Sequence, residues 1–86
     1  MQVMRIATFN SEPVVDEARH AEFLAWMSSQ PGIRAQYHVH AGTQYLSVSV
    51  WDSRELLLAM RDRVPPGGPL GLKPDAVTIY DVDDAR

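Results

Sequence analysis

Cysteine is absent from this 86-residue sequence, which excludes both a disulfide framework and a thiolate metal site. A chain of this length buries only about 60 to 65% of the surface that it exposes when unfolded. Without covalent or metal crosslinks, its stability must come from packing, and we expect a partner subunit to contribute to that packing. The sequence predicts one domain over residues 1–86.

A long apolar segment is also missing. No run approaches the roughly 20 residues that span a bilayer, and the first ten residues lack the apolar stretch of a signal peptide. We therefore expect a cytoplasmic protein that does not bind membranes. Its eight Lys and Arg residues are scattered, and eleven Asp and Glu residues outnumber them, for a formal net charge of -3. This distribution argues against nucleic-acid binding and leaves small molecules and proteins as partners.

The first third of the chain predicts a strand followed by a helix. Residues 3–10 are rich in apolar and β-branched types, and this pattern stops before Ser11. Ser11 is a suitable helix cap and Pro13 a suitable early helical residue, so we expect the helix over residues 13–29. The helix must end there because Pro31 and the glycine after it cannot continue it.

The middle of the chain predicts a β-hairpin, because two alternating runs flank a short turn at Ala41 and Gly42. An even number of loop residues gives one apolar face, with the pairs Val39 and Gln44, Tyr37 and Leu46, and Ala35 and Val48. The opposite face then collects polar and aromatic side chains. These are Arg34, Gln36, His38, His40, Thr43, Tyr45, Ser47, Ser49 and Trp51.

The last third predicts a second helix and a fourth strand. Asp52, with Glu55 three residues later, is close to a capping box, and apolar residues follow it at helical spacing. The Pro- and Gly-rich stretch from Pro65 must end the helix, and the loop that it opens is a candidate flap beside a pocket. Residues 76–82 predict the last strand.

The order strand-helix-strand-strand-helix-strand predicts an α+β, ferredoxin-like fold with a four-stranded antiparallel sheet. Its crossovers place both helices on one face of the sheet. The other face would be an association hazard in a monomer, so we expect a second copy of the chain to cover it and form a homodimer. Whether the apolar or the polar hairpin face meets the helices stays open.

The segment VSVWDSRELL, preceded by QPGIRAQY and followed by a strand ending in YDV, resembles the antibiotic biosynthesis monooxygenase family of dimeric α+β barrels. The resemblance covers most of the chain and implies a homodimer with a pocket between sheet and helices. It also implies, as in some members, oxidation of polycyclic phenols by O2 without metal or flavin. Trp51 matches the family's pocket tryptophan, and Asn10 is similar to an asparagine on its first strand. The haem-degrading branch needs a histidine on the second helix, and this chain has none after His40.

The polar and aromatic hairpin face is the candidate site. If it is covered, its small serines leave room for a planar organic ligand. The alternative is that this face simply meets solvent or the dimer partner. We expect the chemistry to involve His38, Tyr45 and Asn10, and substrate binding to involve Trp51, Ser47, Ser49 and Arg34.

The histidines of this face have two readings. His38 and His40 point the same way and could form a metal pair, but no third ligand has a supporting motif, so we expect neither a metal nor another cofactor. One of them is better interpreted as a base or hydrogen-bond partner for a phenol. His20 lies one turn from Asp16, which favours an intrahelical contact over a role in the pocket.

Three functional hypotheses follow from these residues. The first is a homodimer that binds a small aromatic or phenolic molecule and oxygenates it without a cofactor. The second is a non-catalytic ligand-binding or structural dimer, which the sparse ionisable groups favour. The third is an isomerase of small lactone-like rings, which would need a carboxylate or histidine base in the same pocket.

Overall fold

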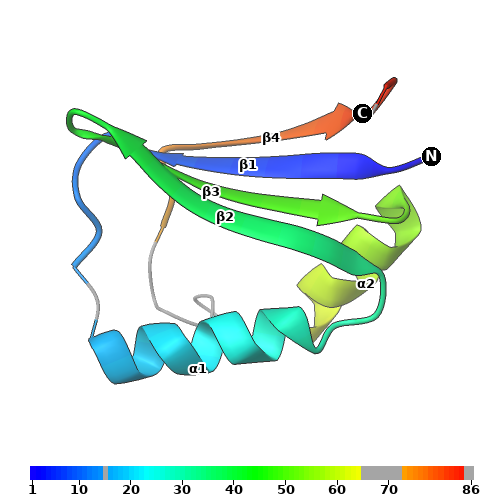
Figure 1. Ribbon diagram of the computed structural model, residues 1–86, viewed down its shortest axis with the longest axis horizontal. Coiled ribbons are helices and arrows are strands. Elements are labelled where there is room, and N and C mark those ends of the chain that lie inside the picture. The colour runs from blue at the N-terminus through cyan, green and yellow to red at the C-terminus, as the bar shows by residue number, and fades with distance from the viewer. Residues whose placement is uncertain (15, 65–72, 85–86) are drawn as a thin grey trace.

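The computed structural model describes residues 1–14, 16–64 and 73–84, and its elements follow the predicted order. One antiparallel sheet contains the four strands in the spatial order β2-β3-β1-β4. Both helices lie on the same side of this sheet (Figure 1). The ferredoxin-like α+β fold is therefore confirmed. The elements are β1 (Val3–Phe9), α1 (Glu17–Ser28), β2 (Ile33–Ala41), β3 (Gln44–Trp51), α2 (Arg54–Arg63) and β4 (Ala76–Asp81).

The first helix begins later than predicted. Its N-cap is Asp16, whose carboxylate accepts a hydrogen bond from the backbone N–H of Ala18 at 2.8 Å, so Ser11 and Pro13 precede the helix. The carboxylate satisfies a free N–H, and its negative charge complements the helix dipole. The helix ends before Pro31, as predicted, and Gly32 takes φ +88° beside the Leu56 side chain.

The second helix is capped by Ser53 rather than by Asp52. The Ser53 hydroxyl accepts from the backbone N–H of Leu56 at 3.3 Å. Asp52 instead accepts a hydrogen bond from Arg34 at 2.5 Å and ties the start of β2 to the end of β3. The predicted capping box is thus wrong by one residue, since serine and aspartate are about equally good caps and sequence alone does not separate neighbours.

The hairpin confirms the predicted faces but not the predicted pairs. The turn is Gly42 and Thr43, with Gly42 at φ +59°, and Val39 lies opposite Leu46 rather than opposite Gln44. Every predicted pair is displaced by two residues. Because side chains alternate with a period of two, a displacement of two leaves each paired residue on its predicted face. Arg34 is the exception, because the pairing is irregular between Ile33 and Ala35 and Ile33 lies opposite Trp51.

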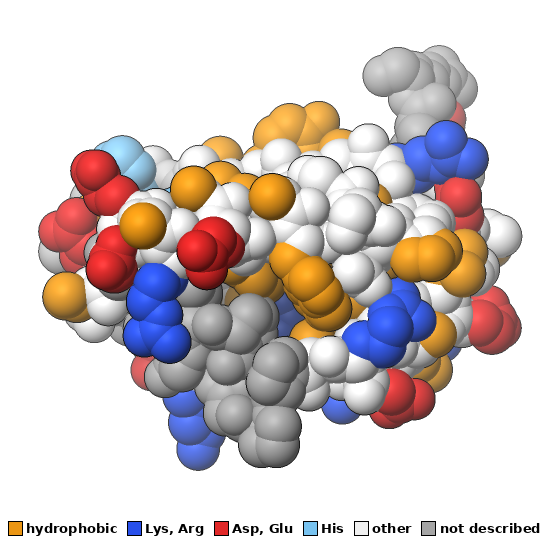
Figure 2. All heavy atoms as spheres, turned by 90° about the horizontal axis from the view of Figure 1, so that it is seen from below, with side chains coloured by type: hydrophobic (Ala, Val, Ile, Leu, Met, Phe, Trp, Pro, Cys, Tyr) orange, Lys and Arg blue, Asp and Glu red, His pale blue; other side chains and the backbone are white. Residues whose placement is uncertain are grey.

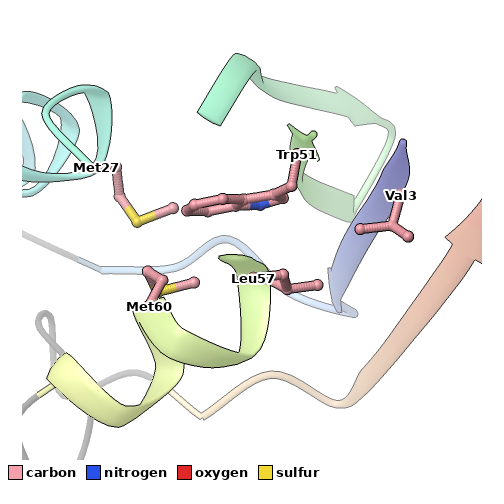
Figure 3. Packing of buried hydrophobic residues seen from close by; sticks show 5 residues of the cluster. All are labelled: Val3, Met27, Trp51, Leu57 and Met60. Carbon is pink, nitrogen blue, oxygen red and sulfur yellow. The ribbon is translucent and has the colours of Figure 1, made fainter. Parts of the chain in front are cut away.

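The core lies at one end of the layer between sheet and helices. Trp51 and Leu57 are fully buried, and Figure 3 shows Met27 of α1 and Met60 of α2 directed at the same point. Val3, paired with Trp51, closes the cluster on β1. The Trp51 ring therefore fills the space where both helices meet the sheet.

The polar and aromatic hairpin face is the one that meets the helices, because it carries Trp51 and Ser49, both buried. The apolar face is not covered by the described residues: Tyr37, Val39 and Tyr80 are 56%, 47% and 53% exposed. The question left open by the sequence is thereby answered. Among the described residues, no helix is long and apolar enough to cross a membrane.

Candidate functional site

A cavity of about 830 Å³ lies between the helix-facing side of the sheet and the helices. The sheet contributes its floor and the helices its opposite wall. The described residues lining it include Arg5, Ala7, Phe9, Glu12, Pro13, His20, Phe23, Met27, His38, Val39, His40, Tyr45, Leu46, Ser47, Met60, Arg61, Val64, Lys73 and Pro74. A space of this size matches the pockets that hold small organic ligands.

Small side chains at the centre of the floor make this space. Ala7 on β1 pairs with Ser47 on β3, and neither side chain reaches far toward the helices. Trp51 lies on the same face of β3, four residues after Ser47, and its ring fills the space between sheet and helices there. The cavity therefore continues the core layer at the end where the sheet carries no bulky side chain.

Imidazole and phenol rings form one wall. The rings of His20 on α1 and His38 on β2 meet edge to face with centroids 5.2 Å apart. His40 stacks on Tyr45 with centroids 5.0 Å apart and planes 18° from parallel. This wall offers a ligand both aromatic contact and hydrogen-bonding atoms.

His38 is shifted toward its neutral form. Burial of its ring lowers the pKa of His38, and the positive charge that His20 can carry lowers it further. A neutral imidazole has one nitrogen free to accept a proton. The His38 ring is thus suited to accept a hydrogen bond or a proton from a ligand hydroxyl.

The other side of the cavity is basic. Arg5 on β1 and Arg61 on α2 both line it, and burial, together with the charge of Arg61, lowers the pKa of Arg5. Among the described residues, Glu12 is the only carboxylate that lines the cavity. The outer surface contrasts with this interior, since Figure 2 shows acidic side chains gathered at the end of the molecule where α1 begins.

The predicted site residues fall into three places. His38, Tyr45 and Ser47 line the cavity together. Trp51 and Ser49 lie in the packed layer beside it, where the Trp51 indole N–H donates to the Ser49 hydroxyl at 2.9 Å. The last two lie apart from the cavity: Arg34 is exposed and pairs with Asp52, and the exposed Asn10 donates its backbone N–H to Asp75 at 2.7 Å.

Two arginines that line the cavity were not among the predicted site residues, although an anionic ligand would need Arg5. Arg61 on the second helix gave no signal of its own. Arg5 did carry one, because it alternates with Val3 and Ala7 on the helix-facing side of β1, and an arginine between two inward residues is unusual on a buried face. The predicted flap at residues 65–72 lies outside the described residues.

A metal site receives no support from this geometry. In the part of the chain that the structure describes, no three His, Cys, Asp or Glu side chains gather closely enough to hold a metal ion. His38 and His40 line the same cavity, yet each makes its ring contact with a different partner, His20 and Tyr45 respectively. The residues present suit an organic ligand better than an ion.

No protein-family model and no curated protein matches the sequence, but solved structures do. One of them is a mutant of SnoaB, a cofactor-independent oxygenase from Streptomyces nogalater. It superposes with a TM-score of 0.73 at 15% sequence identity, and the match covers 98% of this chain and 95% of the SnoaB chain. The fold is that of the antibiotic biosynthesis monooxygenase-like proteins.

Two further structures share this fold over their whole length. A candidate antibiotic biosynthesis monooxygenase from Chloroflexus aurantiacus has a TM-score of 0.66 at 21% identity, covering 100% of this chain and 98% of its own. The haem-degrading protein Rv3592 from Mycobacterium tuberculosis has a TM-score of 0.65 at 16% identity, covering 100% and 99%. The resemblance predicted from the sequence is therefore confirmed at the level of the fold.

Proposed function

We propose that this protein is a homodimer that binds a small aromatic or phenolic molecule in the cavity and oxygenates it without a cofactor. The observation that carries the proposal is the wall of His38 and Tyr45 above the small floor residue Ser47, inside a cavity large enough for a fused-ring ligand. The fold shared with SnoaB, a cofactor-independent oxygenase, supports the same reaction class. Because SnoaB and this chain are only 15% identical, the chemistry is argued from the residues of this chain.

The reaction begins with a proton transfer to His38. A phenol whose hydroxyl lies against the neutral imidazole becomes a phenolate, and this electron-rich ring can reduce O2 directly. One oxygen atom then forms a bond to a ring carbon, and the other leaves as water with the two hydrogens that the substrate loses. The phenol becomes a quinone, so no outside reductant is needed.

Tyr45 and the apolar wall would orient the ring rather than exchange protons. The Tyr45 phenol stacks on His40, which fixes its plane, and Phe23 and Met27 of α1 offer the ligand an apolar cover. A ligand held between these surfaces would keep one edge toward His38. Such positioning supplies part of the rate enhancement by itself.

The homodimer is proposed from the outer face of the sheet. Tyr37, Val39 and Tyr80 form an apolar surface that the described part of the chain leaves exposed. A second copy placed face to face would bury it. Replacing Tyr37 with Glu should then convert the dimer to a monomer in size-exclusion chromatography with light scattering, whereas a monomeric wild type would contradict the dimer.

A non-catalytic binding protein is the second candidate. It is favoured by the position of Trp51, which lies in the core rather than on the cavity wall, and by the two predicted polar residues that lie outside the cavity, Asn10 and Arg34. The same cavity would then bind an aromatic metabolite without changing it.

Oxygen uptake separates the two candidates. Purified protein is mixed with a panel of mono-, bi- and tricyclic phenols, O2 consumption is recorded, and products formed under 18O2 are analysed by mass spectrometry. Oxygenation predicts one labelled oxygen atom per product and a rate that falls at least about a hundredfold in His38→Gln, the usual scale for a lost general base. Tyr37→Phe, the neighbouring residue on the opposite face, is the matched control. Binding without uptake across the panel would favour the non-catalytic protein.

A further inference from the structure

Two arginines, Arg5 and Arg61, line the cavity, and neither forms an ion pair with a carboxylate among the described residues. We propose that the ligand is an aromatic hydroxy acid, whose carboxylate lies between Arg5 and Arg61 while its hydroxyl reaches the histidine wall. This inference rests on the proposed binding function and narrows it to one class of ligand. It is independent of whether the bound molecule is oxygenated.

Arg5 is held in place by its position in the sheet. It lies on β1, a central strand, between Ser49 of β3 and Ile79 of β4, and its side chain is partly buried on the helix-facing side. A guanidinium remains charged even where burial lowers its pKa. Partial burial of a permanent charge is unfavourable unless an anion balances it.

The described residues provide no such balance. The ion pairs they form are Arg34 with Asp52 and Arg54 with Asp81, and both lie apart from the cavity. Arg61 adds a second positive charge that is close enough to lower the pKa of Arg5 by repulsion. Two like charges directed into one space define a site for an anion placed between them.

Glu12 does not neutralise this pair. It follows the end of β1 at Phe9, whereas Arg5 lies four residues earlier, which corresponds to about 13 Å along a strand. Among the described residues, no ion pair joins Glu12 to either arginine. The positive charge of Arg5 and Arg61 is left for a ligand.

The chemistry of the anion follows from the donors. Guanidinium groups bind planar carboxylates through paired N–H donors, and two of them can grip one carboxylate from both sides. The ring wall offers the complementary contact, since His38 accepts a hydroxyl proton. His38 and Arg5 lie two strands apart, or about 10 Å across the sheet. A bicyclic or tricyclic ring system with its two polar groups at opposite ends fits that separation.

The test compares two ligands that differ only in the carboxylate. Isothermal titration calorimetry measures binding of 2-naphthol and of 6-hydroxy-2-naphthoate to the wild type, Arg5→Gln, Arg61→Gln and Arg19→Gln. Arg19 is an exposed arginine on α1 outside the cavity and serves as the charge-matched control. Circular dichroism melting verifies that each variant folds. If Arg5→Gln does not fold, Arg61→Gln still provides the test, because Arg61 lies at an exposed position of α2.

The expected result is that the wild type binds the naphthoate at least about tenfold more tightly than 2-naphthol, as charge-assisted hydrogen bonds to one carboxylate would give. Arg5→Gln and Arg61→Gln should each bring the ratio of the two affinities close to one, while Arg19→Gln preserves the wild-type ratio. Equal binding of both ligands, or a preference that survives both cavity variants, overturns the hydroxy-acid inference alone. If neither ligand binds, the proposed binding function fails first and the inference fails with it.

Discussion

The two ends of the layer between sheet and helices are built from opposite kinds of side chain. At one end Val3, Trp51 and Leu57 leave no space, and at the other Ala7 and Ser47 leave a cavity of about 830 Å³. The same strands, β1 and β3, run through both ends. Packing and binding are therefore separated along the strands rather than between layers.

The attachment of α1 follows the same division. Its second half is held to the sheet, because the Gln36 amide donates to the Leu24 carbonyl at 3.0 Å and to the Ser28 hydroxyl at 2.8 Å, and Met27 is buried. His20 in its first half and Phe23 at its middle line the cavity instead. Stability should thus depend on the packed end, and ligand binding on the open end.

The strongest way to break this comparison is to remove a side chain from the packed end. Leu57→Ala should lower the free energy of unfolding by about 2 to 5 kcal/mol, since it deletes a fully buried side chain and leaves a void. Leu58→Ala, at a neighbouring position of α2 that is 41% exposed, is the matched control and should change it by less than about 1 kcal/mol. Urea unfolding measures both. Similar losses for the two variants would contradict the division.

A larger side chain in the cavity should weaken ligand binding and leave the stability of the fold nearly unchanged. Ser47→Phe places a ring where the cavity floor is low, so it should weaken binding of 2-naphthol or 6-hydroxy-2-naphthoate by at least about tenfold with little change in melting temperature. Ser47→Ala keeps the room and removes only the hydroxyl, so it should bind nearly as the wild type does. A large drop in melting temperature for Ser47→Phe would mean that this end is already packed.

The basic side of the cavity should lower stability in the absence of ligand. Arg5→Met removes a partly buried charge that has no ion-pair partner among the described residues, and it should raise the free energy of unfolding by about 1 kcal/mol. Arg19→Met, at an exposed position, should leave it unchanged. Melting curves at one protein concentration measure the difference, because the proposed dimer would make the melting temperature depend on concentration. A destabilised Arg5→Met variant would mean that Arg5 has a structural partner.

The sequence predicted the fold well because the signals that define it are local and repeat. Alternation in the hairpin identified both faces, and the sequence around Pro31 identified the end of α1. The predicted register was wrong by two residues because the turn is Gly42 and Thr43 rather than Ala41 and Gly42. The alternation of side chains does not change when the pairing is displaced by two residues, so it could not detect this error. The predicted first residues of both helices were wrong for a similar reason, since several neighbouring residues can act as the helix cap.

The candidate site was predicted less completely, and the reason is geometric. His38, Tyr45 and Ser47 share one face of the hairpin, so the alternation that defines the face also groups them. Arg5 and Arg61 reach the cavity from β1 and α2, and only the tertiary fold brings these elements together. Asn10 and Arg34 stay predictions for the site, although the structure places them apart from the cavity.

The smallest expected effect concerns the titration of His38, and it sharpens the comparison because the five residues of the buried cluster carry no titratable side chain. Burial, and then the charge of His20, lower the folded-state pKa of His38 below 6.5, so between the two values the unfolded chain binds more protons. Stability from this group is fully present above pH 6.5 and is lost as the pH falls through the folded pKa.

His38→Gln should therefore flatten the fall in melting temperature between neutral and mildly acidic pH, by a small amount because much of His38 remains exposed. His40→Gln leaves the contact between His38 and His20 in place and should keep the wild-type slope. A bound hydroxy acid should steepen the dependence in the wild type, since its hydroxyl needs the neutral imidazole. The same slope in the wild type and His38→Gln, with and without ligand, would mean that the histidine wall does not hold the ligand hydroxyl.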